Sequence, residues 1–150
     1  MVGSEGNIRE DDHVSEQDNL HTIHKVYAAF EQGDVEGVIS MLTDDVRWTT
    51  PGPPDVIPYA GLRWGHDQVT GYFEAFGQAA ETTEFEPQEF FAQDDHVVVL
   101  GHYTFSVVKT GKVVDNDWVH AFEFSDGKVS AFEGYEDSAA VVAAFTAKPD

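Results

Sequence analysis

Apolar side chains recur every three or four residues in the first half of the chain, which is the spacing of amphipathic helices. The first apolar face is made of Leu20, Ile23, Val26, Tyr27 and Phe30. Gly33 ends this helix, and Asp34 is a suitable N-cap for a second helix over residues 35–42. A third helix is expected over residues 67–80. The first half of the chain is therefore predicted to be mainly helical.

The second half alternates between apolar and polar positions, which is typical of strands. Strands are expected over residues 84–93, 96–108, 113–124 and 128–136. A shorter strand over 46–50 precedes the irregular, Pro-rich segment 51–65, a candidate lid or rim. A closing helix is expected over 139–147, capped by Asp137. Helices followed by consecutive strands predict an α+β fold, with an antiparallel sheet carrying helices on one face.

Residues 1–18 contain many acids and few apolar groups, so we expect a disordered acidic tail there. Residues 19–148 are predicted to form a single domain, because no internal repeat or linker divides them. The start of the chain lacks the basic and apolar segments of a signal peptide, and no apolar stretch is long enough to span a bilayer. We therefore expect a cytoplasmic location.

The charge of the chain limits its partners. The sequence has 8 Lys and Arg against 28 Asp and Glu, a formal net charge of −20. Such a chain repels phosphate backbones and anionic membrane surfaces, so we expect neither nucleic acid nor a membrane as a partner. The absence of cysteine excludes disulfides, thiolate metal sites and a cysteine nucleophile.

Strand alternation singles out one histidine. Between residues 113 and 124, Trp118, His120 and Phe122 share the apolar face. A two-residue turn at Thr110-Gly111 would place Gly101 opposite His120 and Tyr103 opposite Trp118, so that the glycine leaves space beside the imidazole. An inward histidine is either a hydrogen-bonded core residue or a functional group, and the pattern alone leaves both open.

Other groups of polar residues in the sequence give weaker evidence for a functional site. His21 and His24 lie three positions apart on a helix, but no acid joins them on one face, so we expect no metal site. Phosphate-binding loops, nucleophile elbows and zinc-protease sequences do not occur in the chain. Arg63 is available either for an anionic ligand group or for surface acids, while Glu136 and Asp137 are expected near the mouth of a pocket.

Three segments carry a family resemblance: VYAAFEQGDVEGVISMLTDDVRW, IPYAGLRWGHDQVTGYFEAF and DNDWVHAFEFSDGKVSAFEGYED. With them the chain resembles the nuclear transport factor 2-like superfamily, in its SnoaL-like and ketosteroid-isomerase-like branch. The resemblance implies a cone-shaped, strongly curved antiparallel sheet wrapped around N-terminal helices (a cystatin-like α+β barrel), a short C-terminal helix and an apolar pocket. It also implies a homodimer through the outer sheet face, where His102, Thr104 and Ser106 are expected.

The resemblance also places site residues. His120 falls where the isomerases carry an oxyanion-stabilising Asp, and Thr50 stands where they carry their general base, a role that Thr cannot fill. The isomerase tyrosine of the first helix corresponds to Val26, with Tyr27 one step around the helix. Gly134 occupies the position of an Asp of the epoxide hydrolases. The resemblance therefore disfavours both reactions in the form in which those families catalyse them.

The expected function is binding of a small hydrophobic carbonyl compound of the polyketide, steroid or terpenoid type. Isomerase, cyclase or dehydratase chemistry would use His120 as the catalytic acid or base, with neither cofactor nor metal. Ligand-binding positions are expected at Trp48, Tyr59, Phe73, Tyr103, Trp118, Phe122 and Phe132. Two alternatives stay open: a binding domain of the same fold without chemistry, in which His120 holds a ligand carbonyl, and a dimerisation or interaction domain.

Overall fold

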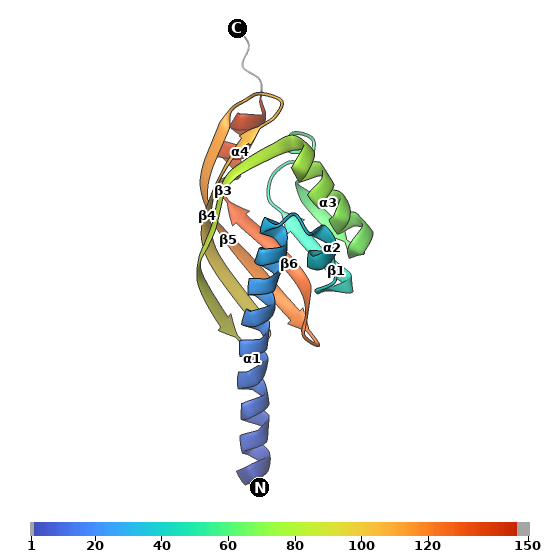
Figure 1. Cartoon of the computed structure of the whole chain (residues 1–150), viewed down its shortest axis with the longest axis vertical. Helices are drawn as coiled ribbons and strands as arrows, with labels where there is room; N and C mark the ends of the chain where they lie inside the picture. Colours follow the sequence, from blue (N-terminus) through green and yellow to red (C-terminus); the bar gives the residue numbers. More distant parts are fainter. Residues whose placement is uncertain (1, 147–150) are drawn as a thin grey trace.

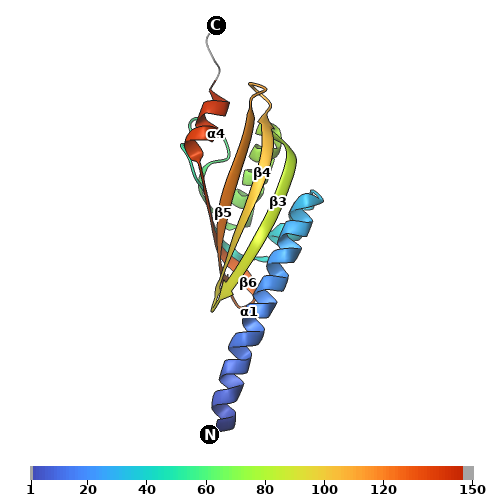
Figure 2. The ribbon, with the colours of Figure 1, turned by 90° about the vertical axis from the view of Figure 1, so that its left-hand side faces the viewer.

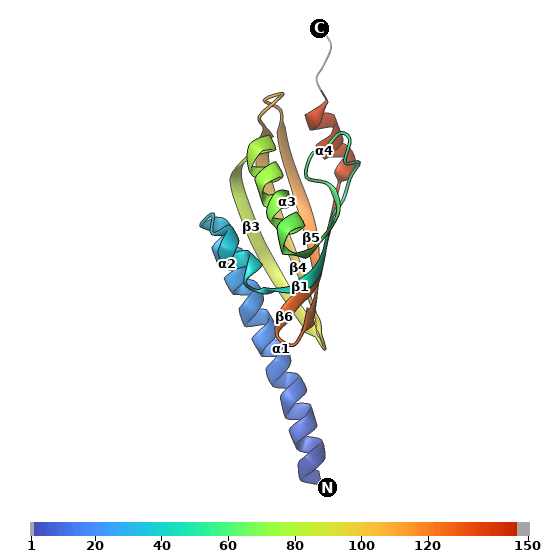
Figure 3. The same ribbon diagram turned by 90° about the vertical axis from the view of Figure 1, so that its right-hand side faces the viewer.

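The computed structural model describes residues 2–146, with side chains from residue 16 onward. Its elements are α1 (Val2–Glu31), α2 (Val35–Ile39), β1 (Leu42–Thr50), β2 (Gly61–Trp64), α3 (Gly65–Ala79), β3 (Ala80–Gln93), β4 (His96–Val107), β5 (Val113–Ser125), β6 (Lys128–Glu136) and α4 (Ser138–Phe145). One six-stranded sheet has the order β2-β1-β6-β5-β4-β3. The sheet is curved and unclosed, and α1 and α3 lie on one of its faces (Figures 1 and 3). The expected α+β class is confirmed.

The sheet differs from the expected antiparallel sheet in two respects. Strands β1 and β6 pair in parallel, whereas the other four pairings are antiparallel. A parallel pair requires a long connection, which the whole stretch from residue 51 to residue 127 provides here. In addition, the segment expected to be irregular contains β2, which pairs with β1 as an edge strand and places Arg63 opposite Trp48.

The helix boundaries follow from capping chemistry. The Asp34 carboxylate accepts a hydrogen bond from the Gly37 backbone N–H at 2.9 Å, as expected for the N-cap of α2. Helix α2 ends at Ile39 rather than at residue 42, because Leu42 is fully buried as the first residue of β1. Asp137 caps α4 by accepting from the Ala140 N–H at 3.2 Å. Both predicted caps are confirmed.

The N-terminal part of the chain is helical in the structure, in addition to the helix predicted from residue 18 onward. The backbone of α1 is helical from Val2, where composition predicted a disordered tail up to residue 18. Adding residues to an existing helix avoids the cost of nucleation, so a helix anchored by its packed C-terminal part can extend in this way. This first part of α1 projects beyond the sheet (Figure 2), and the division at residues 18 and 19 stays a prediction. The predicted domain end at residue 148 lies outside the described residues.

The β4–β5 hairpin has a longer turn than expected. Val107 N–H donates to the Lys112 carbonyl at 2.8 Å, so four residues form the turn, and Gly111 adopts a positive φ of 74° within it. Gly101 consequently pairs with Trp118, and Val99 pairs with His120. The predicted pairing was wrong by two residues, a shift that leaves every side chain on its expected face.

Segment 51–60 covers one end of the sheet and is firmly packed. Ile57, Tyr59 and Ala60 are buried within it. Arg63 donates to the backbone carbonyls of Pro58 and Gln68, at 3.4 Å and 3.2 Å, and thus joins this segment to α3. Both of these hydrogen bonds go to main-chain oxygens rather than to surface acids, and the expected role of Arg63 toward an anionic ligand group stays a prediction. Among the described helices, none is long and apolar enough to cross a membrane.

Candidate functional site

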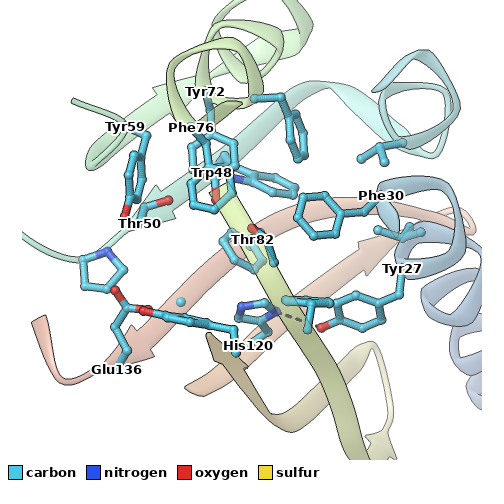
Figure 4. A pocket seen from close by; sticks show the side chains of 18 of the residues that line it. Tyr27, Phe30, Trp48, Thr50, Tyr59, Tyr72, Phe76, Thr82, His120 and Glu136 are labelled. Carbon is cyan, nitrogen blue, oxygen red and sulfur yellow. Dashed lines mark hydrogen bonds between the residues drawn. The ribbon is translucent and has the colours of Figure 1, made fainter. Parts of the chain in front are cut away.

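A cavity lies between the inner face of the sheet and helices α1 and α3 (Figure 4). The cavity has a volume of about 90 Å³, which is room for several waters. Its walls are mainly aromatic, and the rings contact one another closely: Trp48 stacks on Phe132 at 4.2 Å between centroids. Small, mostly apolar molecules are the ligands that such a lining favours.

The structure brings together most of the predicted site residues. His120 lines the cavity together with Trp48, Tyr59, Phe73, Tyr103, Phe122 and Phe132. Trp118 is not part of the lining. Its indole stacks on the imidazole of His120 at 3.9 Å and on Phe85 at 5.2 Å, in the space left by Gly101. Gly101 therefore makes room for Trp118 rather than for a ligand beside His120, because the two-residue change of register moved the glycine away from His120.

Several cavity residues were not among the ligand-binding positions predicted from the sequence, although Glu136 was expected near the pocket mouth. They include Tyr27, Phe30, Thr50, Tyr72, Phe76, Thr82, Phe85, Phe105, Gly134 and Glu136. Tyr27 and Phe30 were identified only as the apolar face of a helix, because helical spacing does not distinguish packed rings from cavity walls. Glu136 shares an alternating face with Phe132, and this was the available signal for an inward carboxylate.

Tyr27 and His120 form a hydrogen-bonded pair in the cavity. The Tyr27 hydroxyl lies 2.8 Å from His120 Nδ1. Burial lowers the pKa of His120 to about 3 and raises the pKa of Tyr27 well above its usual value. Both groups are therefore neutral near pH 7.

The position of the proton in this pair follows from hydrogen-bond satisfaction. Within the described residues, Tyr27 has only His120 as an acceptor for its hydroxyl proton. Donation from Tyr27 to Nδ1 places the imidazole proton on Nε2. That nitrogen points away from Tyr27 in Figure 4 and has no hydrogen bond to the described protein groups. The pair thus offers an N–H donor to a ligand.

A second polar cluster lies beside the first. The Tyr103 hydroxyl donates to Glu136 Oε1 at 2.7 Å. The buried amide of Asn116 donates to the Tyr103 oxygen and to the Asp137 carbonyl, both at 3.2 Å. Burial raises the pKa of Glu136 above its ordinary value, while the hydrogen bond from Tyr103 partly opposes this. Burial also raises the pKa values of Tyr59, Tyr72 and Tyr103, so these hydroxyls stay protonated.

Gly134 keeps the space between the two clusters open. It pairs with His120 across β5 and β6, and it precedes Glu136 by two residues on the same face. A Cβ atom at this position would lie 3.5 Å from both Phe132 Cζ and Pro51 Cδ, and 3.8 Å from His120 Cδ2. The missing side chain therefore leaves a gap in the cavity floor next to His120, Phe132 and Pro51.

The outer face of the sheet carries a different histidine. His102 Nδ1 lies 2.8 Å from Asp117 Oδ1, and Nε2 lies 2.5 Å from Asp115 Oδ1. These hydrogen bonds, first that with Asp117 and then that with Asp115, raise the pKa of His102 above its usual value. Among residues 16–146, no His, Asp or Glu side chains gather into a group of three able to hold a metal ion. His24 instead packs on Phe90, 4.2 Å between ring centroids.

Comparison with known proteins agrees with this architecture. A family model described as a SnoaL-like domain matches residues 23–132. A crystal structure of a nuclear transport factor 2-like protein from Burkholderia xenovorans is 30% identical, with a TM-score of 0.80, and the match covers 87% of this chain and 98% of that one. No curated protein matches the sequence.

Two further solved structures are similar. TerC, co-crystallized with polyporic acid, is 27% identical with a TM-score of 0.77, over 85% of this chain and 98% of that one. A SnoaL-like polyketide cyclase from a Jannaschia species has a TM-score of 0.73 over 89% of this chain and 95% of that one. At 19% identity, the latter shows a shared fold only.

Proposed function

The chain belongs to the SnoaL-like domain family, and from that premise we propose that its cavity binds a small, uncharged carbonyl compound of the polyketide, steroid or terpenoid type. The aromatic walls favour a flat apolar ligand. An anionic ligand is disfavoured, because Glu136 lines the cavity and the chain has a net charge of −20.

The observation that carries the proposal is the neutral Tyr27–His120 pair in an apolar cavity. Its outward N–H is suited to donate to the oxygen of a ligand carbonyl. A histidine whose pKa is about 3 binds a proton weakly at pH 7, so His120 serves better as a hydrogen-bond donor than as a base. Donation to a carbonyl oxygen supports isomerase, cyclase or dehydratase chemistry without a cofactor, and binding without chemistry is the alternative.

One relative supports the choice of ligand class. TerC was co-crystallized with polyporic acid, and this chain matches nearly the whole of it. Uncharged aromatic ketones, which share its rings and carbonyl groups, are therefore rational first ligands for this protein, together with steroid and terpenoid ketones.

A thermal-shift screen with these compounds tests the proposal. A ligand at one hundred times its Kd adds about 2.7 kcal/mol of stability, which raises Tm by several degrees for a domain of this size. We expect Gly134→Val, which fills the gap in the cavity floor, to abolish the shift, and His120→Gln to weaken it. His102→Gln on the outer face is the matched control and should bind normally. Failure of every compound to raise Tm would refute the proposal.

The homodimer through the outer sheet face stays a prediction. On that face, apolar side chains such as Leu100, Val119 and Tyr135 retain accessible surface, and Tyr135 is 51% exposed. A second copy of the chain would cover them, while the nearby Asp115 and Asp117 would repel their counterparts. Sedimentation equilibrium tests this prediction, with Tyr135→Glu expected to shift a dimer to monomers. A monomer at all concentrations would contradict it.

A further inference from the structure

We propose that Glu136 is the catalytic base of this cavity: its carboxylate removes a proton from the carbon next to the ligand's carbonyl while the Tyr27–His120 pair holds the carbonyl oxygen. This inference rests on the proposed function, because it requires a carbonyl compound in the cavity. It assigns proton transfer to a residue for which the sequence offered no more than a place near the pocket mouth.

The two strands place base and donor around one gap. Glu136 and Gly134 point to the same face of β6, and Gly134 lies directly opposite His120 on β5. Because Gly134 has no side chain, a space stays open beside the imidazole, bordered by the ring of Phe132 and by Pro51. A flat ligand resting on Gly134 has His120 on one side and Glu136 on the other. The carbon next to the carbonyl then lies on the side of the carboxylate.

The carboxylate is held in a defined orientation. Tyr103 donates to Oε1 at 2.7 Å, and Asn116 donates to the Tyr103 oxygen, which directs the hydroxyl proton toward Glu136. Among the described residues, Oε2 has no hydrogen-bond partner and is available to accept a proton. Asn116 is a positioning residue that acts through Tyr103. The hydroxyl of Tyr103 positions Glu136, while its ring forms part of the cavity wall.

Electrostatics support this assignment. Burial, and more weakly the neighbouring Asp137, raise the pKa of Glu136, which makes its ionised form a stronger base than an exposed carboxylate. His120 is the other titratable group in the lining that is not a tyrosine, and burial lowers its pKa to about 3. The opposite shifts assign the base to Glu136 and the neutral donor to His120.

The step balances within the protein and the ligand. The C–H bond next to the carbonyl breaks, and its proton moves to Glu136 Oε2. The electron pair forms a carbon–carbon double bond, and the carbonyl electrons move to the oxygen, where the N–H of His120 stabilises the charge. Protonated Glu136 then returns a proton to the same carbon, which gives exchange, or to another carbon, which gives an isomer. Neither outcome requires an oxidant or a second substrate.

Deuterium exchange tests the inference without a known substrate. The probe is 2-tetralone, a small aromatic ketone with acidic C–H bonds next to its carbonyl, in D₂O, and NMR follows the loss of its proton signals. General-base catalysis contributes about 10²- to 10⁴-fold, so Glu136→Gln should slow the enzyme-dependent exchange at least 100-fold. Glu133→Gln, on the exposed face of the same strand, is the matched control and should exchange at the wild-type rate.

The dependence of the exchange rate on pH distinguishes the role of Glu136 as the base from the role of Tyr103 in positioning it. The wild-type exchange rate should rise with pH through the raised pKa of Glu136 and then level off, because the ionised form is the base. The hydrogen bond from Tyr103 lowers that pKa, so Tyr103→Phe should move the inflection to higher pH. A variant that merely packed less well would lose rate without moving the inflection.

Binding of 2-tetralone, measured by thermal shift on the same variants, distinguishes two kinds of failure. If Glu136→Gln binds the ketone and exchanges it as fast as wild type, Glu136 is not the base, while the binding function stands. Binding by wild type with no exchange above that of Glu136→Gln overturns the inference in the same way. If wild type does not bind the ketone, the proposed function fails for this compound and the inference fails with it.

Discussion

His120 and His102 lie on neighbouring strands of one sheet but face opposite sides. His120 on β5 points into the aromatic cavity, where its one polar partner among the described residues is the neutral Tyr27. His102 on β4 lies on the outer face between Asp117 and Asp115. The pKa of the first is lowered by burial, and that of the second is raised by two carboxylates. The same side chain is therefore a neutral donor inside, whereas outside two carboxylates favour its protonated form.

This difference shows how the sheet separates two kinds of chemistry. The inner face is mainly aromatic and shielded from bulk solvent, so each of its polar groups has a large effect on a ligand. The outer face is exposed to solvent and rich in acids, so its ion pairs are screened and contribute little to stability. Function is expected on the inner face, and the following predictions test that division in order of expected effect.

Acid should destabilise the protein chiefly through the inner histidine. The pKa of His120 is about 3 in the folded protein, below its unfolded value, so the stability that this group contributes is present above about pH 6.5 and is lost as pH falls toward 3. Relative to His120→Gln, wild type should lose a few kcal/mol of unfolding free energy over this range, as measured by urea titration. Parallel pH dependence of the two proteins would contradict the assignment.

His102→Gln is the matched variant for that experiment. The folded pKa of His102 is raised, so its contribution is present below the unfolded pKa and disappears as pH rises through the folded value. The His102 variant should therefore show the same acid destabilisation as wild type. Its difference from wild type should be small and of opposite sign.

Filling the inner face behind His120 should cost less than protonating the histidine. A Cβ at Gly101 would collide with the Trp118 indole and lie 2.6 Å from the Glu86 carbonyl, so Gly101→Ala should destabilise the fold by about 1–3 kcal/mol in urea unfolding. Gly77→Ala on α3 is the control, because nothing lies within 4 Å of the Cβ that alanine would add there and alanine favours the helix. Equal stability of the two variants would refute this account of Gly101.

The smallest effect on stability is expected on the outer face. Asp117→Asn should lower the pKa of His102 toward its ordinary value, and Asp115→Asn should lower it less, as followed by NMR of the imidazole protons. Neither change should move the His120 signals, which lie on the other face of the sheet. Because the cluster is exposed, unfolding free energy should change little. If the pKa of His102 stays raised in both variants, something other than these two carboxylates raises it.

Local patterns in the sequence were sufficient to predict the order of the helices and main strands and the face of each long strand. Alternation placed His120 and its neighbours inside and His102 outside, because strand side chains alternate regardless of partner. Local capping chemistry located Asp34 and Asp137 at helix starts, because a cap depends on a few adjacent residues. These predictions needed no knowledge of distant contacts.

Which inward residues meet depends on contacts between distant parts of the chain, and local patterns do not encode these. The Tyr27–His120 bond joins residues 93 positions apart, and the Tyr103–Glu136 bond depends on the register of two hairpins. A two-residue turn was predicted between β4 and β5, but the turn has four residues. As a result Gly101 pairs with Trp118 instead of with His120. Periodicity defines a face but not a register, and register together with sheet curvature decides which side chains surround the cavity.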